Sequence, residues 1–126
     1  MKFYRCDVCG RIVEETKSGA GTLDCCGQPM RALEPGATDG AHEKHVPDVW
    51  IEGVNVVVRV GSVEHPSTPA HYIEWIAIET TSGTQRKTLD PGDLPKAEFT
   101  LAPSEKLVAA YEYCNLHGLW IRDLAE

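Results

Sequence analysis

The chain has 126 residues, of which 42% are hydrophobic and 25% charged, a composition typical of globular domains rather than of disordered chains. Its 12 Lys and Arg residues and 19 Asp and Glu residues give a net charge of −7, which argues against nucleic acid or an anionic membrane as its partner. Because the sequence contains neither an apolar run of about 18 residues nor an apolar leader segment, we expect a cytoplasmic protein without a membrane span.

The N-terminal part of the chain is dominated by cysteines. Four of the five cysteines lie in the first 33 residues, with a short strand predicted at 11–14 and a turn at 17–21 between the two pairs. A segment shorter than about 40 residues usually needs a metal or disulfides to fold. We therefore expect a small metal-dependent domain at 1–35.

The Gly- and Pro-containing run at 34–40 ends this part of the chain. We expect a linker and active-site loop at 36–44 and a second domain at 45–126.

The second domain is predicted to consist of consecutive β-strands. Its predicted strands cover 55–63, 72–80, 97–101, 107–113 and 119–124. Alternation places Val56, Val58 and Val60 on one face of the first strand, and Ile76 and Ile78 on the opposite face of the second strand from Ile73. Turn sequences separate them at Ser82-Gly83, Asp90-Pro91-Gly92-Asp93 and Ala102-Pro103-Ser104. A helix at 107–111 is an alternative on propensity alone. Short strands at this spacing predict an all-β fold with an antiparallel β-sandwich.

The first candidate site consists of Cys6, Cys9, Cys25 and Cys26. The Cys-x2-Cys pair places two thiolates on one turn, whereas two adjacent cysteines reach one ion only if the backbone bends, which Gly27 and Pro29 favour. An odd number of cysteines favours metal or redox use over a secreted disulfide framework. Four thiolates suit zinc or a single iron, and a purely structural zinc knuckle and a disulfide pair remain alternatives.

The second candidate site consists of His45, His65, His71, Cys114 and His117. Taken singly, each histidine is more often a surface or satisfied core residue, and a lone cysteine is more often a buried apolar residue. The His65–His71 loop contains two prolines, however, and Cys-x2-His is metal-ligand spacing. Zinc is almost always four-coordinate, so five ligands favour iron with an open sixth position. A thiolate ligand would donate electron density to that iron.

Three segments of the sequence resemble desulfoferrodoxin, the two-iron class of superoxide reductase: EKHVP at 43–47, HYIEWI at 71–76 and CNLHGLW at 114–120. The resemblance implies a small rubredoxin- or desulforedoxin-like metal-knuckle domain at 1–35, followed by a neelaredoxin-like domain at 40–126 with an immunoglobulin-like antiparallel β-sandwich. It implies iron at the four cysteines. It also implies a second iron with four equatorial histidines and Cys114 on the axis. The loop at 66–70 departs from relatives, and His42 matches no ligand position.

The resemblance also implies a function, the one-electron reduction of superoxide to hydrogen peroxide at the second iron. The first iron would have an accessory or electron-relay role. The implied catalytic residues are Lys44, which would attract superoxide, and Glu43, which in the family can occupy the sixth position of ferric iron. A small redox protein such as rubredoxin is the implied electron donor, and a homodimer is the implied assembly. The alternatives are a rubredoxin-like electron-transfer module with a structural second metal site and a purely structural zinc protein.

Overall fold

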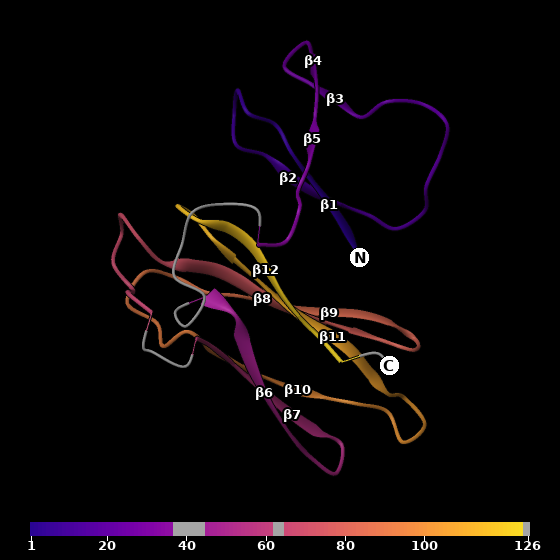
Figure 1. Ribbon diagram of the computed structural model, residues 1–126, viewed down its shortest axis with the longest axis vertical. Coiled ribbons are helices and arrows are strands. Elements are labelled where there is room, and N and C mark those ends of the chain that lie inside the picture. Colours follow the sequence, from indigo (N-terminus) through magenta and orange to yellow (C-terminus); the bar gives the residue numbers. More distant parts are fainter. Residues whose placement is uncertain (37–44, 62–64, 125–126) are drawn as a thin grey trace. The chain divides into compact units, whose positions relative to one another are not determined.

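The computed structural model describes residues 1–36, 45–61 and 65–124 and contains twelve β-strands (Figure 1). The chain separates into two compact units, unit 1 at Met1–Glu34 and unit 2 at Pro35–Glu126. Most of the predicted 36–44 linker lies outside the described residues, so that segment stays a prediction. Over the described part of the chain, no helix is long and apolar enough to cross a membrane.

Unit 1 is a small β-structure with almost no apolar core. Its strands are β1 (Lys2–Arg5), β2 (Ile12–Glu15), β3 (Asp24–Cys25), β4 (Gln28–Pro29) and β5 (Arg31–Ala32). They form a three-stranded sheet in the order β2-β1-β5 and a separate β3-β4 hairpin. Phe3 and Cys6 are the only buried residues among the first 34. Apolar packing alone is therefore too small to stabilise this unit.

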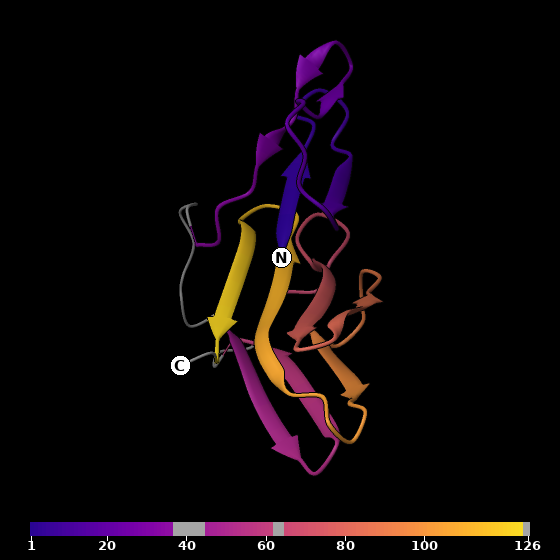
Figure 2. The same cartoon turned by 90° about the vertical axis from the view of Figure 1, so that its right-hand side faces the viewer.

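Unit 2 is an antiparallel β-sandwich, which confirms the predicted fold class. Its strands are β6 (Pro47–Glu52), β7 (Asn55–Val60), β8 (Ile73–Thr80), β9 (Gly83–Thr88), β10 (Lys96–Thr100), β11 (Leu107–Cys114) and β12 (Gly118–Asp123). A three-stranded sheet in the order β10-β7-β6 and a four-stranded sheet in the order β12-β11-β8-β9 form its two layers (Figure 2). Residues 107–111 belong to β11, so the helical alternative was wrong there.

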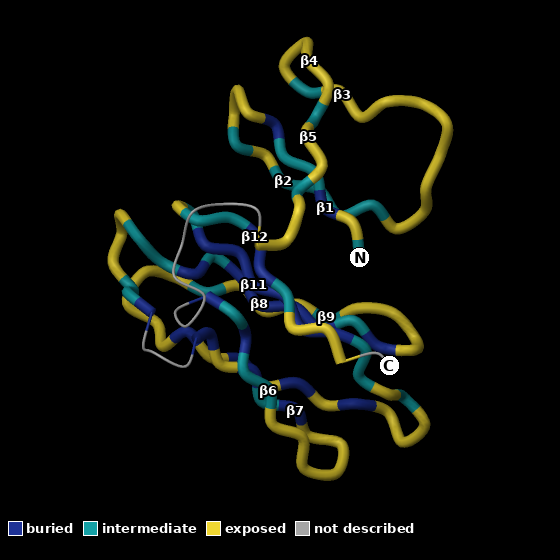
Figure 3. Tube along the Cα trace, in the orientation of Figure 1, coloured by how far each residue is buried: buried dark blue, intermediate teal, exposed yellow. Residues whose placement is uncertain are grey.

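The core of unit 2 lies between the two sheets. Val56, Val58 and Val60 alternate inward from β7, as predicted, and all three are fully buried. They share one apolar cluster with Ile76 and Ile78 of β8. The buried segments of Figure 3 follow the central strands of both sheets, whereas most of β9 is exposed. This core holds the strand ends that carry the second candidate site.

One predicted side-chain direction was wrong. Ile73 was expected on the opposite face of its strand from Ile76, but both belong to the core cluster. The cause is an irregularity between β11 and β8, where Tyr113 pairs with Trp75 and the next residue, Cys114, pairs with Ile73. The extra residue on β8 reverses the alternation and turns Ile73 toward the core.

Candidate metal centres

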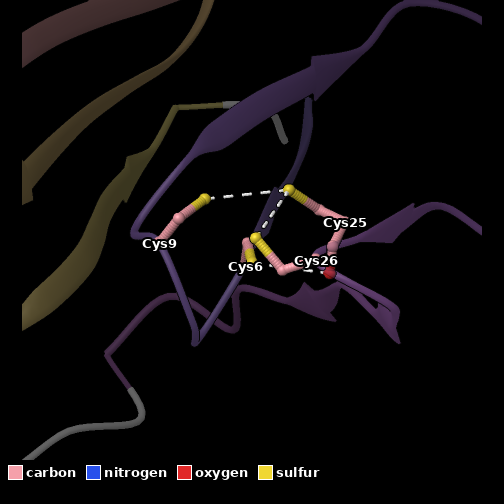
Figure 4. A group of neighbouring side chains, drawn as sticks. All are labelled: Cys6, Cys9, Cys25 and Cys26. Atoms are coloured by element: carbon pink, nitrogen blue, oxygen red, sulfur yellow. Dashed lines mark hydrogen bonds between the residues drawn. The ribbon is translucent and has the colours of Figure 1, made fainter.

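The four cysteines of unit 1 come together from two turns. Cys6 and Cys9 lie in the turn after β1, and Cys25 and Cys26 lie at the end of β3 (Figure 4). The backbone φ is +55° at Cys26 and +75° at Gly27, so the chain bends where adjacent side chains would otherwise point to opposite faces. The predicted bend therefore includes Cys26 itself.

The sulfur separations fit one tetrahedral ion. Cys9 Sγ lies 3.7 Å from Cys25 Sγ, which lies 3.9 Å from Cys26 Sγ, and all four sulfurs lie within 4.8 Å of one another. Thiolates bound at about 2.3 Å to one tetrahedral ion are about 3.8 Å apart. A disulfide needs about 2.05 Å, and all four cysteines are free. The donor set therefore fits a metal and not a disulfide pair.

The ionisation of these thiols is uneven. The backbone N–H of Cys9 lowers the pKa of Cys6 to about 7, whereas hydrogen bonding from Cys6 and Cys9 raises the pKa of Cys25 to about 12. The neighbouring Cys9 also raises the pKa of Cys26. Four adjacent thiolates repel one another, so a cation is needed to hold all of them ionised.

A charged cluster supports the Cys6–Cys9 turn. Asp7 accepts hydrogen bonds from Arg5 at 2.9 Å and from Arg31 at 3.0 Å. Arg31 holds the pKa of the Asp7 carboxyl below its ordinary value. Because Arg31 belongs to β5, this contact links the turn to the strand that closes the sheet.

The second set of candidate ligands lies at one end of the sandwich. His45 precedes β6, His65 follows β7, His71 precedes β8, Cys114 ends β11 and His117 precedes β12. The antiparallel register brings these strand ends together, because Pro47 pairs with Val60 and Cys114 pairs with both Ile73 and Gly118. Ligands separated by more than seventy positions in the sequence therefore share one site.

The four imidazoles form a closed cycle in the order His45, His65, His71 and His117. Consecutive ring centroids are 4.8, 4.7, 5.1 and 4.7 Å apart, with interplanar angles between 74° and 83°. Across the cycle, the rings of His45 and His71 are 6.4 Å apart and nearly parallel, at 26°. This is the pattern of a square, in which neighbours are perpendicular and opposite members face each other.

The nitrogen separations favour right-angled coordination. His45 Nε2 lies 3.2 Å from His65 Nε2 and 3.0 Å from His117 Nδ1. Two nitrogens bound to one ion at about 2.1 Å are about 3.0 Å apart at a right angle and about 3.4 Å apart at a tetrahedral angle. The His45–His117 separation matches a right angle and the His45–His65 separation lies between the two values. Taken with the square arrangement of the rings, they favour a five- or six-coordinate ion such as iron over tetrahedral zinc.

The tautomer of His65 is set by its neighbour. His65 Nδ1 lies 2.7 Å from the Pro66 carbonyl oxygen, which can only accept, so Nδ1 carries the proton and Nε2 presents its lone pair to the site. Burial lowers the pKa of His65 to about 4. The ring is therefore neutral, and able to bind a metal, at physiological pH.

Cys114 is fully buried beside the imidazole cycle. Its Sγ lies 3.9 Å from His117 Nδ1 and within 4.8 Å of a ring nitrogen of each of the other three histidines. One sulfur can approach four corners of a square this closely only from outside their plane. Burial raises the pKa of Cys114, and the backbone N–H groups of Leu116 and His117 in the following turn partly offset that rise.

Comparison with known proteins agrees with both sites. Residues 1–33 match the family model described as the N-terminal domain of desulfoferrodoxin, and residues 37–123 match the model described as desulfoferrodoxin. The chain belongs to the desulfoferrodoxin family.

Two relatives and one solved structure match this chain almost end to end. It is 52% identical to a desulfoferrodoxin homolog from Archaeoglobus fulgidus, over 95% of this chain and 94% of that one. It is 46% identical to desulfoferrodoxin from Nitratidesulfovibrio vulgaris, over 94% and 93% of the two chains. The solved superoxide reductase from Treponema pallidum superimposes with a TM-score of 0.81 at 37% identity, over 97% of this chain and 98% of that one.

Trp120 contacts two histidines of the second site, the ring of His45 and the backbone of His117, and was missed from the sequence. Its indole stacks on His45 with centroids 5.0 Å apart at 22°, and its Nε1–H donates to the His117 carbonyl oxygen at 3.0 Å. The backbone N–H of Gly36 donates to the carbonyl oxygen of Leu119, the residue before Trp120, at 2.7 Å. A Cβ added at Gly36 would lie 3.8 Å from the indole ring. The only available signal was a tryptophan three residues after a candidate ligand.

Glu112 is the second residue that sequence reasoning missed. It is fully buried two positions before Cys114, and neither carboxyl oxygen has a hydrogen-bond partner among the described residues. Burial raises the pKa of Glu112 well above its ordinary value. A glutamate within a strand reads from sequence as a solvent-facing residue, so nothing indicated this position.

The two predicted catalytic residues, Lys44 and Glu43, lie outside the described residues, as does His42. Their roles stay predictions from the sequence. The nearest described ligand is His45, which is buried.

Proposed function

We propose that this chain is a superoxide reductase, which converts superoxide to hydrogen peroxide by adding one electron and two protons. The observation that carries the proposal is the square of four imidazoles with a buried cysteine sulfur outside its plane. Its cofactors are two iron ions, one with ligands Cys6, Cys9, Cys25 and Cys26, and one with ligands His45, His65, His71, His117 and Cys114. Iron bound at the second set supplies the electron for superoxide and regains it from a donor.

The ligands of the second site determine its net charge and therefore how strongly it attracts an anion. Neutral imidazoles and a single thiolate leave a net charge of +1 with ferrous iron and +2 with ferric iron. An acidic protein of net charge −7 thereby presents a local positive target for superoxide. The backbone N–H groups of Leu116 and His117 stabilise the Cys114 thiolate, and the Pro66 carbonyl keeps the His65 lone pair directed inward.

Metal analysis and a superoxide pulse test the proposal together. We expect two irons per chain, visible absorption from both centres and rapid oxidation of the reduced protein by superoxide, with hydrogen peroxide as the product. A colourless zinc protein would support the purely structural alternative. Two irons without reaction with superoxide would support the electron-transfer module with a structural second site. Either result contradicts superoxide reduction by this chain.

Lys44 is proposed to attract superoxide. In Lys44→Ala the second-order rate constant with superoxide should fall and depend less on salt, because a positive charge near the site has been removed. Pulse measurements over a range of ionic strength check this. A rate constant and salt slope equal to those of the unaltered protein would remove Lys44 from the mechanism.

Glu43 is proposed to bind the ferric site after the reaction. In Glu43→Ala the initial rate with superoxide should stay near normal, because the residue acts after electron transfer. The visible absorption band of the resting ferric protein should shift, because one ligand has changed. Absorption spectra of both oxidised proteins check this, and identical spectra would contradict ligation by Glu43.

The four-cysteine iron is proposed as an electron relay. Cys6→Ser removes one of its ligands, so the second iron should still react with superoxide but should be re-reduced more slowly by the donor. Stopped-flow re-reduction with reduced rubredoxin checks this. Unchanged re-reduction would limit the first centre to an accessory role.

A rubredoxin-like electron donor and a homodimer complete the proposal and rest on the family resemblance alone. A cytoplasmic location is also proposed, and it rests on the sequence, which contains no apolar leader segment. Sedimentation of the purified protein tests the dimer directly.

A further inference from the structure

The side chain of Asn115 bonds the peptide groups on both sides of His71. Its Oδ1 accepts from the backbone N–H of Tyr72 at 3.0 Å, and its Nδ2 donates to the carbonyl oxygen of Ala70 at 3.1 Å. Its backbone N–H also donates to the Tyr72 carbonyl at 3.2 Å. A single residue adjacent to Cys114 therefore makes three hydrogen bonds to the two neighbours of another candidate ligand.

The orientation of this amide is determined by its partners. A backbone N–H can only donate and a carbonyl oxygen can only accept, so Oδ1 must face Tyr72 and Nδ2 must face Ala70. Thr68 completes the arrangement, because its N–H donates to the His71 carbonyl at 3.0 Å and its carbonyl accepts from the His71 N–H at 3.1 Å. The His71 backbone is therefore held by its own loop and, through Asn115, by the turn after β11.

We propose that Asn115 is a positioning residue that couples the His71 imidazole to the Cys114 thiolate. The proposal rests on the ligand set of the proposed function. Because Asn115 follows Cys114 directly, a displacement of the His71 loop would also displace the segment that carries the sulfur. The amide thereby fixes one corner of the imidazole square relative to the thiolate.

Other contacts support the remaining histidines. The His65 ring is oriented by the Pro66 carbonyl, the His45 ring stacks on Trp120, and the His117 carbonyl accepts from the Trp120 indole N–H. Asn115 acts on peptide groups rather than on an imidazole, so its loss should change where the His71 ring lies without altering the chemistry of any ligand atom. Supporting residues of this kind typically contribute 10- to 100-fold to metal affinity.

Two substitutions separate the contributions of the amide. Asn115→Ala removes both side-chain bonds, so iron release from the second centre to a chelator should be about 10- to 100-fold faster. The ferric absorption and paramagnetic resonance signals of that centre should also change. Asn115→Asp keeps an acceptor for Tyr72 and loses the donor to Ala70, so its release rate should be intermediate. The four-cysteine centre is an internal reference whose absorption should stay unchanged.

Gln85→Ala is a matched control. Gln85 Nε2 donates to the Thr100 carbonyl at 3.0 Å, which is also an amide-to-backbone bond in the same sandwich. Gln85 lies on β9, and this bond joins it to β10 rather than to a loop that carries a ligand. We expect its loss to leave iron release and the ferric spectra unchanged, even where the thermal stability of the variant decreases slightly.

Three results would overturn the proposal. One is release from Asn115→Ala within about twofold of the unaltered protein, with unchanged spectra. Another is equal acceleration in Gln85→Ala, which would indicate general destabilisation. If Asn115→Ala does not fold, unchanged release and spectra in Asn115→Asp would overturn it. An unaltered protein that binds iron at the second centre without reducing superoxide would contradict the proposed function and leave the Asn115 test intact.

Discussion

Cys114→Ser is expected to lose superoxide reduction almost completely while keeping the four-cysteine iron centre. Cys114 is fully buried, and two backbone N–H groups stabilise its thiolate. A serine hydroxyl is much harder to ionise than a thiol, so the variant should lose the electron donation that a thiolate supplies. We expect a rate at least about 100-fold lower, equivalent to roughly 3 kcal/mol of transition-state stabilisation.

Pulse kinetics on protein of known iron content would measure this effect. Cys26→Ser is the matched control, because it makes the same substitution in the other centre and should leave the reaction of the second iron with superoxide near normal. Near-normal turnover by Cys114→Ser, with its second iron bound, would refute the donation argument. Loss of turnover in both variants would point to a general effect of cysteine replacement.

Glu112→Gln is expected to stabilise the sandwich at neutral pH. Burial raises the pKa of Glu112 well above its ordinary value of 4.5, so the folded protein keeps this carboxyl protonated where the unfolded chain does not. Folding near pH 7 must therefore take up a proton, and stability falls as pH rises above the unfolded pKa. Glutamine avoids this cost, and the free energy of unfolding should rise by about 1–3 kcal/mol.

The free energy of unfolding, measured between pH 4 and pH 8 at matched iron content, tests whether the stability gained in Glu112→Gln increases with pH. The difference between Glu112→Gln and the unaltered protein should be small at pH 4 and should grow as pH rises. Glu98→Gln is the control, because Glu98 is exposed on β10 and its replacement should change stability by less than about 0.5 kcal/mol at every pH. A constant or decreasing difference for Glu112→Gln would contradict a buried, protonated carboxyl.

Much of the fold and of both ligand clusters could be predicted because the signals are local. The Cys6-x2-Cys9 and Cys114-x2-His117 spacings each place two donors on one turn, and the alternating valines of β7 indicate a buried face. The resemblance of the 71–76 and 114–120 segments to desulfoferrodoxin then predicted that ligands distant in the sequence bind the same iron, which no local pattern indicates. The structure adds the antiparallel register that explains how they meet.

What could not be predicted depends on contacts between distant segments. The strand β9 (Gly83–Thr88) is polar and mostly exposed, so it has no apolar alternation from which to be recognised. The direction of Ile73 depends on one extra residue in the pairing of β8 with β11. The contacts of Asn115 and Trp120 and the burial of Glu112 exist only once the sheets have assembled. Residue type alone gave no indication of them.

The confinement of every ligand of unit 2 to one end of the sandwich has a practical consequence. The opposite end contains the Gly53-Val54 and Thr81-Ser82 turns, and β8, with its eight residues, separates Ser82 from the ligand end by about 25 Å. A chemical tether introduced at Ser82 would therefore anchor this unit to a solid support with its imidazoles directed away from the attachment point. Immobilised in that orientation, the protein would be a starting point for an amperometric sensor of dissolved superoxide.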